Sequence, residues 1–174
     1  MNDQTINIKE VKQGINSAFA NIQFPGDKYL LNLACKDESE VENFKGKNWQ
    51  KWQDIPQEVI DYNYDSLPFL SPLALRFFLP AYMTYSLNNL GSNVLEFTIY
   101  KLIAPNDSKD LELRELFFFW VSQLTEEQKT AITLFLKYVK AQYEQRQLFP
   151  NDADEALQSY WEHCHVYDTA LCLY

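Results

Sequence analysis

Two groups of residues in this 174-residue chain have side chains that could perform chemistry, and the first lies near the C-terminus. His163, Cys164 and His165 are followed by Asp168 and Cys172, which are ligand types that zinc takes in proteins. Residues two apart on a helix point about 200° from each other, so His163 and His165 could share a metal only in an extended segment. Zinc sites usually show paired ligand spacings, which this segment lacks, so we expect no metal.

The second group surrounds Arg76, the only charged residue between Asp65 and Glu96. The neighbouring residues are apolar, and a guanidinium enclosed by them needs carboxylate or carbonyl partners. Asp61 and Asp65 are the nearest acids in sequence. One interpretation, which we favour, is a structural ion pair with the preceding helix. The other is an anion-binding pocket formed by Arg76, Tyr82 and Asp65.

Sequence patterns of the common enzyme classes are missing from the chain. No two of its four glycines lie within six residues of each other, so it has no glycine-rich loop for phosphates or dinucleotides. It has neither the Gly-x-Ser-x-Gly turn of many hydrolases nor the His-Glu-x-x-His pair of zinc proteases. These absences favour a protein without enzymatic activity, and we expect no catalytic residues and no cofactor.

Aromatic residues make up 16% of the chain and include 11 tyrosines and 4 tryptophans. Protein interfaces are enriched in these two residue types. Trp49, Trp52 and Tyr62 stand among polar residues, so we expect them to be exposed and to form an interface. Other rings lie in apolar runs and are predicted to belong to the core: Phe77, Phe78, Phe117 and Trp120.

The chain is acidic, with 15 basic and 24 acidic side chains and a net charge of −9 at pH 7. A field of this sign repels nucleic acids and anionic lipids, so we expect neither as a partner. The excess is larger in residues 88–174, so a basic protein partner is expected to meet that half. Its acids are either solvated helix starts or an interface rim: Asp107, Asp110, Glu112 and Glu115, then Asp152, Asp154 and Glu155.

Helical periodicity dominates the chain. Helices are predicted over residues 6–21, 56–64, 73–87 and 126–146, with a last helix that starts at Asn151 or Asp152. Ser71 and Pro72 form a strong start signal, and Thr125 and Gln128 match a capping box. Pro80 lies inside the predicted helix 73–87, where we expect a kink or a break.

Two segments leave the type of element open. Residues 94–103 fit a strand, because Leu95, Phe97 and Ile99 alternate, and they also fit a short helix. Residues 113–124 have helical spacing as well as a run of aromatic residues that suits a buried strand. For this second segment we favour a helix.

Four blocks of residues follow the pair Trp49 and Trp52 along the chain. They are Phe69-Leu70-Ser71-Pro72, Arg76-Phe77-Phe78-Leu79-Pro80-Ala81-Tyr82-Met83, Leu124-Thr125-x-x-Gln128 and Ala156-Leu157-x-x-Tyr160-Trp161. In this order they resemble an uncharacterised bacterial domain family of unknown function over roughly residues 15–161. The resemblance implies one bacterial, cytoplasmic domain and supplies no activity.

These observations predict a mainly α single domain of six or seven helices around residues 73–87, with at most one small strand pair and a loose tail over residues 162–174. The odd cysteine count and the polar start, without a signal peptide, predict a cytoplasmic protein. We expect a non-enzymatic interaction domain that masks a basic partner, as immunity proteins and antitoxins do. The alternative is a small-molecule-binding protein or enzyme with an anion pocket around Arg76.

Overall fold

The structure of the protein is a computed structural model that describes residues 6–33, 35, 37–105, 111–148 and 150–164. Helices dominate these residues, so the predicted mainly α fold is confirmed. Within the described ranges there is no strand. Where the sequence prediction allowed one small strand pair, these ranges contain one antiparallel bridge, between Leu31 and Leu70. No helix in these ranges is long and apolar enough to cross a membrane.

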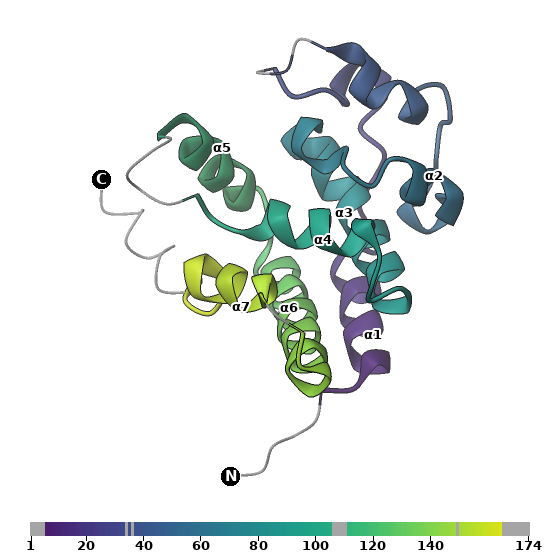
Figure 1. Ribbon diagram of the computed structural model, residues 1–174. Helices are drawn as coiled ribbons and strands as arrows, with labels where there is room; N and C mark the ends of the chain where they lie inside the picture. The colour runs from purple at the N-terminus through teal and green to yellow at the C-terminus, as the bar shows by residue number, and fades with distance from the viewer. Residues whose placement is uncertain (1–5, 34, 36, 106–110, 149, 165–174) are drawn as a thin grey trace. The chain divides into compact units, whose positions relative to one another are not determined.

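The chain divides into two compact units (Figure 1). The central unit comprises residues 15–101, and the split unit comprises residues 1–14 together with residues 102–174. Helix α1 (Ile8–Ala18) begins in the split unit and ends in the central unit. The prediction that the chain is one domain with a loose tail stays a prediction.

The central unit is built on α3 (Pro72–Asn88), which contacts α2 (Gln57–Tyr62) and two short 3₁₀ helices, η3 (Trp52–Asp54) and η4 (Leu67–Phe69). The helix starts where the sequence predicted, because the Ser71 hydroxyl accepts a hydrogen bond from the Ala74 amide at 3.1 Å. Phe77 and Phe78 are buried, as predicted. Helix α3 continues through Pro80, so the break that we allowed there does not occur, and the alternative, a kink, stays a prediction.

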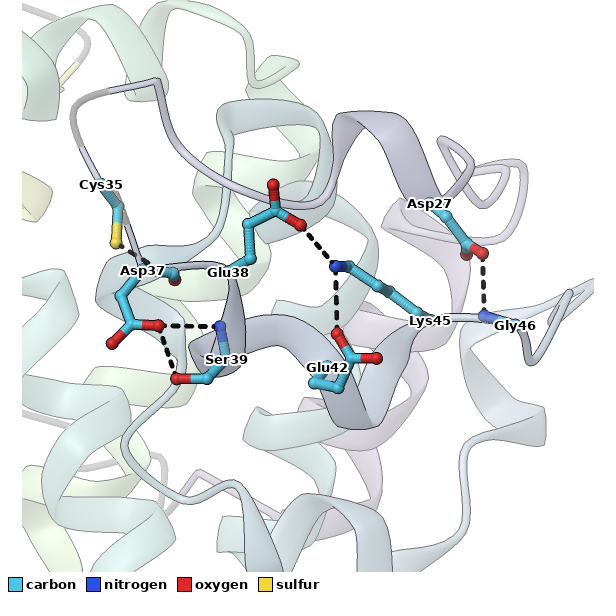
Figure 2. Close-up of polar contacts among 8 residues, drawn as sticks. All are labelled: Asp27, Cys35, Asp37, Glu38, Ser39, Glu42, Lys45 and Gly46. Atoms are coloured by element: carbon cyan, nitrogen blue, oxygen red, sulfur yellow. Dashed lines mark hydrogen bonds and ion pairs between the residues drawn. The ribbon is translucent and has the colours of Figure 1, made fainter.

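Polar contacts hold the segment before α2, which contains the 3₁₀ helices η1 (Asp27–Tyr29) and η2 (Glu38–Phe44). Figure 2 shows that Lys45 bridges Glu38 and Glu42 with ion pairs of 2.9 and 3.1 Å. The carboxylate of Asp27 accepts from the amide of Gly46 at 2.8 Å. Because Gly46 has a φ of 70°, this turn favours glycine.

The last element of the central unit is α4 (Asn93–Leu102), which ends one residue beyond the unit boundary. The segment that could have been a strand is therefore helical. Val94, Leu95 and Ile99 are buried, and their spacing fits one side of a helix.

The split unit contains α5 (Leu111–Ser122), α6 (Glu126–Arg146), α7 (Asp152–Ala156) and the π-helical turn η5 (Leu157–Trp161). Helix α6 has the predicted bounds. Its capping box is confirmed, because the Thr125 amide donates to Gln128 Oε1 at 3.2 Å and the Gln128 amide donates to Thr125 Oγ1 at 3.3 Å. Both α7 and η5 pack against α6.

An aromatic cluster forms the core of the split unit. Phe117 and Trp120, predicted as core residues, are buried and contact Trp161 with ring centroids 6.5 and 6.0 Å apart. The indole of Trp161 donates to the Leu102 carbonyl at 2.7 Å. The predicted helix over residues 113–124 is thus confirmed as α5, with the rings of Phe117 and Trp120 on the buried side.

Candidate interaction surface

The three residues of the predicted anion pocket differ in burial and in their contacts. Tyr82 is fully buried, and its hydroxyl donates a hydrogen bond to the Asn63 carbonyl. Burial and, secondarily, the charge of Asp65 raise the pKa of Tyr82 above its usual range, so this hydroxyl stays protonated. Since its proton is already used within the protein, Tyr82 is poorly placed to bind an external anion.

Arg76 is half-buried on α3. Arg76 takes part in an interaction and is not free. Of the two acids that we named as its partners, Asp61 accepts a hydrogen bond from the hydroxyl of Tyr85 at 2.7 Å. The ion pair between Arg76 and the preceding helix stays a prediction.

The three aromatic residues predicted at an interface differ in exposure. Tyr62 is 75% exposed. Trp49 is half-buried and packs its ring against Phe78 with centroids 5.6 Å apart. Trp52 is only 3% exposed, and its indole donates to the Phe19 carbonyl at 3.1 Å, so the predicted exposure of Trp52 is wrong.

The histidine and cysteine group of the C-terminal segment is described only in part. His163 is exposed, whereas Cys164 is buried and its thiol lies 3.5 Å from the Trp161 carbonyl as a weak donor. The other members, His165, Asp168 and Cys172, lie outside the described residues. Within the described part of the chain, no group of His, Cys, Asp or Glu side chains has an arrangement that could hold a metal ion.

The acids of the predicted rim also differ in their surroundings. Glu112 and Glu115 on α5 are exposed, and Asp107 and Asp110 lie outside the described residues. The interpretation of Asp154 as a solvated acid is wrong, because Asp154 is half-buried and forms a 2.5 Å ion pair with Lys140. The same contact raises the pKa of Lys140.

Exposed tyrosines and acids gather at α2 and α4 of the central unit. Tyr62 is the last residue of α2, and Tyr100, on α4, is 68% exposed. Tyr64, two residues beyond the end of α2, contacts Phe97 of α4 with ring centroids 5.2 Å apart at an interplanar angle of 67°. Phe97 and Tyr100 are three residues apart and so share one side of α4.

We call this region the acidic–tyrosine surface. It consists of Asp61, Tyr62, Tyr64, Asp65, Glu96, Phe97 and Tyr100. All seven residues are exposed or half-buried. They belong to one unit, and the contact between Tyr64 and Phe97 connects the part at and after the end of α2 with the part on α4.

The carboxylates of the acidic–tyrosine surface are not balanced by cations. In the described part of the chain, Asp61, Asp65 and Glu96 take part in no ion pair. By contrast, Glu38 and Glu42 share Lys45 (Figure 2) and have a structural role. Of these two groups of acids, the acidic–tyrosine surface is therefore the one whose negative charge is available to a partner.

Sequence reasoning found Tyr62 and missed Tyr100 and Phe97. Both missed residues lie in the segment whose pattern fitted a strand as well as a helix. In a strand, Phe97 and Tyr100 would point to opposite sides. Phe97 and Tyr100 lie on one side only if the segment is a helix. In that helix the exposed residues Asn93, Glu96 and Tyr100 are three and four residues apart.

The fold and the surface define a mainly α protein whose described residues present an acidic, tyrosine-bearing surface and no assembled metal group. The chain belongs to the family of unknown function DUF6714, which matches residues 7–165. The resemblance to a family of unknown function is thereby confirmed. No curated protein and no solved structure matches the chain.

Proposed function

We propose that this protein is a non-enzymatic, cytoplasmic bacterial interaction domain that binds a basic protein through the acidic–tyrosine surface. Such binding would mask the partner, as an immunity protein or an antitoxin does. The observation that carries the proposal is the presence of two largely exposed tyrosines, Tyr62 and Tyr100, beside carboxylates without ion pairs.

The chemistry of this surface suits lysine and arginine side chains. A cation over a tyrosine ring gains about 0.5–1 kcal/mol at an exposed site and more when it is desolvated. Carboxylates at the rim add charge-assisted hydrogen bonds and increase the rate of encounter with a basic protein. The net charge of −9 acts in the same direction over a longer range.

The alternative function, an anion pocket around Arg76, has less support. Its tyrosine, Tyr82, is enclosed and hydrogen-bonded to the backbone of Asn63. Arg76 and Asp65 remain predicted site residues, but no observation on the described residues favours a ligand there.

The proposal is tested by capture of partners from a lysate of the host with the wild-type protein and with a Tyr62→Ser, Tyr100→Ser double variant. We expect a basic protein to be retained by the wild type at low salt and lost from the double variant. Tyr29→Ser is the matched control, because Tyr29 is an exposed tyrosine of the same unit outside the acidic–tyrosine surface. Equal retention by both variants, or retention of no basic protein, would contradict the proposal.

A further inference from the structure

We propose that α5 of the split unit is a second docking site, which binds an amphipathic helix with lysine or arginine residues from a partner protein. This site lies on a different unit from the acidic–tyrosine surface and does not depend on it. The proposal rests on the exposure of apolar side chains along α5 and on the charge beside them.

Helix α5 has apolar residues on two sides, and only one side is enclosed by the protein. Phe117, Trp120 and Val121 form the buried side. On the opposite side, Leu111 is 70% exposed and Phe119 is 57% exposed. A helix within a monomer usually presents polar residues to water, so the second apolar side needs an explanation.

Five exposed or half-buried residues follow one line along α5, which we call the outer stripe. It consists of Leu111, Glu115, Phe118, Phe119 and Ser122. These positions are spaced i, i+4, i+7, i+8 and i+11, which places them on one side of a helix. The 12 residues of α5 extend about 18 Å, enough to contact about three turns of a partner helix.

Charge decides what kind of partner fits the outer stripe. Glu115 lies within the stripe and Glu112 lies beside it, and within the described ranges neither carboxylate forms an ion pair. Arg114 lies over the ring of Phe118, 5.1 Å from its centroid, on the edge of the stripe. An apolar stripe with unpaired carboxylates complements a helix that carries leucine-like anchors flanked by cations.

A second copy of the same chain fits this side poorly. Two α5 helices paired antiparallel about the middle of the stripe would bring Glu115 of each copy together. Like charges at the centre of an apolar contact are costly, because desolvation strengthens their repulsion. The charge pattern therefore favours a basic partner over self-association.

The test uses a fluorescein-labelled peptide of about 18 residues, with leucines at one helical stripe and lysines elsewhere, titrated with the full-length protein. Fluorescence anisotropy gives the dissociation constant. We expect Leu111→Ser and Phe119→Ser each to weaken binding about tenfold or more, as for anchor residues of an interface. Leu148→Ser, at another exposed leucine of the same unit, should leave binding unchanged.

A lysine-rich peptide can also bind any acidic protein through its overall charge, so a second pair of variants separates the two effects. Glu115→Lys and Glu155→Lys change the net charge equally, and both residues are exposed in the split unit. Only Glu115→Lys should weaken binding strongly. Equal weakening by both, or equal binding of a peptide with glutamates in place of the lysines, would overturn the proposal.

Two further measurements distinguish this proposal from the proposed function and from self-association of the protein. The Tyr62→Ser, Tyr100→Ser variant should bind the peptide like the wild type, so failure of the proposed function leaves this test intact. Sedimentation equilibrium gives the oligomeric state. A dimer that Phe119→Ser converts to a monomer would show that α5 pairs with itself and would overturn the basic-helix partner.

Discussion

Trp52 shows how a single side chain can join two parts of the central unit that are distant in sequence. Its indole N–H donates to the carbonyl of Phe19, 33 residues earlier, while its ring is almost wholly enclosed. The hydrogen bond gives the enclosed indole N–H an acceptor, and the Phe19 carbonyl accepts from the Ile22 amide as well, at 3.4 Å. Such satisfaction matters because an unpaired buried polar group costs about 1–3 kcal/mol.

Replacement of Trp52 by Phe should lower the free energy of unfolding by about 1–3 kcal/mol, because the Phe19 carbonyl loses one of its two donors and the smaller ring leaves space. Urea denaturation followed by circular dichroism measures the change. Trp49→Phe is the matched control, since Trp49 is half-buried. A larger loss for Trp49→Phe than for Trp52→Phe would contradict the assignment.

Lys101 is a second residue whose surroundings have a measurable consequence. Burial lowers its pKa to about 8, whereas the ordinary lysine pKa is 10.5. Between these two pH values the unfolded chain holds more protons than the folded one, so the free energy of unfolding rises with pH.

Relative to Lys101→Met, the wild type should therefore gain about 1–2 kcal/mol of stability between pH 7.5 and pH 9.5. Urea denaturation of both proteins at the two pH values gives the difference, in which the titration of other groups cancels. A difference that stays constant or falls with pH would show that Lys101 titrates normally.

At the scale of elements, helix starts with their own local hydrogen bonds were predictable from sequence. Ser71 caps α3 and Thr125 caps α6, and each bond joins residues three apart. Helices α4 and α5 were harder, because apolar spacing over ten or twelve residues fits two periods and the choice depends on contacts distant in sequence. The same ambiguity prevented the prediction of part of the acidic–tyrosine surface, because Tyr100 and Phe97 share a side only when α4 is helical.

Trp52 was misread for a related reason. Its sequence neighbours are polar, which indicated exposure, but it lies in the short helix η3, which packs on α3. The polar and apolar pattern around Trp52 in the sequence gives no information about the contact between η3 and α3. Tyr62 also stands among polar residues, and it is exposed because it ends α2, at the surface of the central unit.

The capping box of α6 predicts the effect of a conservative change. Thr125→Ala removes the oxygen that accepts from the Gln128 amide, and N-cap substitutions of this kind cost about 1 kcal/mol. Thermal denaturation measures the loss. Thr130→Ala is the control inside the same helix, where alanine has the higher helix propensity, so that variant should be neutral or slightly stabilised.

At the scale of the whole molecule, the net charge of −9 opposes compaction through repulsion among the acids. Added NaCl screens this repulsion, because the Debye length falls from about 10 Å at 0.1 M to about 3 Å at 1 M. The melting temperature at pH 7 should therefore rise with salt, by about 2–4 °C for each kcal/mol regained.

A charge reversal gives the matching control for that prediction. Glu155→Lys changes the net charge from −9 to −7, because a negative group is replaced by a positive one. It should raise the melting temperature at low salt and reduce the dependence of the melting temperature on salt. Differential scanning calorimetry of both proteins at several NaCl concentrations measures both quantities. A melting temperature that falls as salt is added would mean that attractive ion pairs outweigh the net repulsion.

The division of the chain into a central and a split unit also sets an order of events during synthesis. The central unit is one continuous segment, residues 15–101, and it can fold once that segment has left the ribosome. Residues 6–14 belong with the later part of the chain, so they must wait until the last helices emerge. Ribosome-bound chains just long enough for residue 101 to have left the ribosome should therefore protect residues 15–101 from proteases before residues 6–14 are protected.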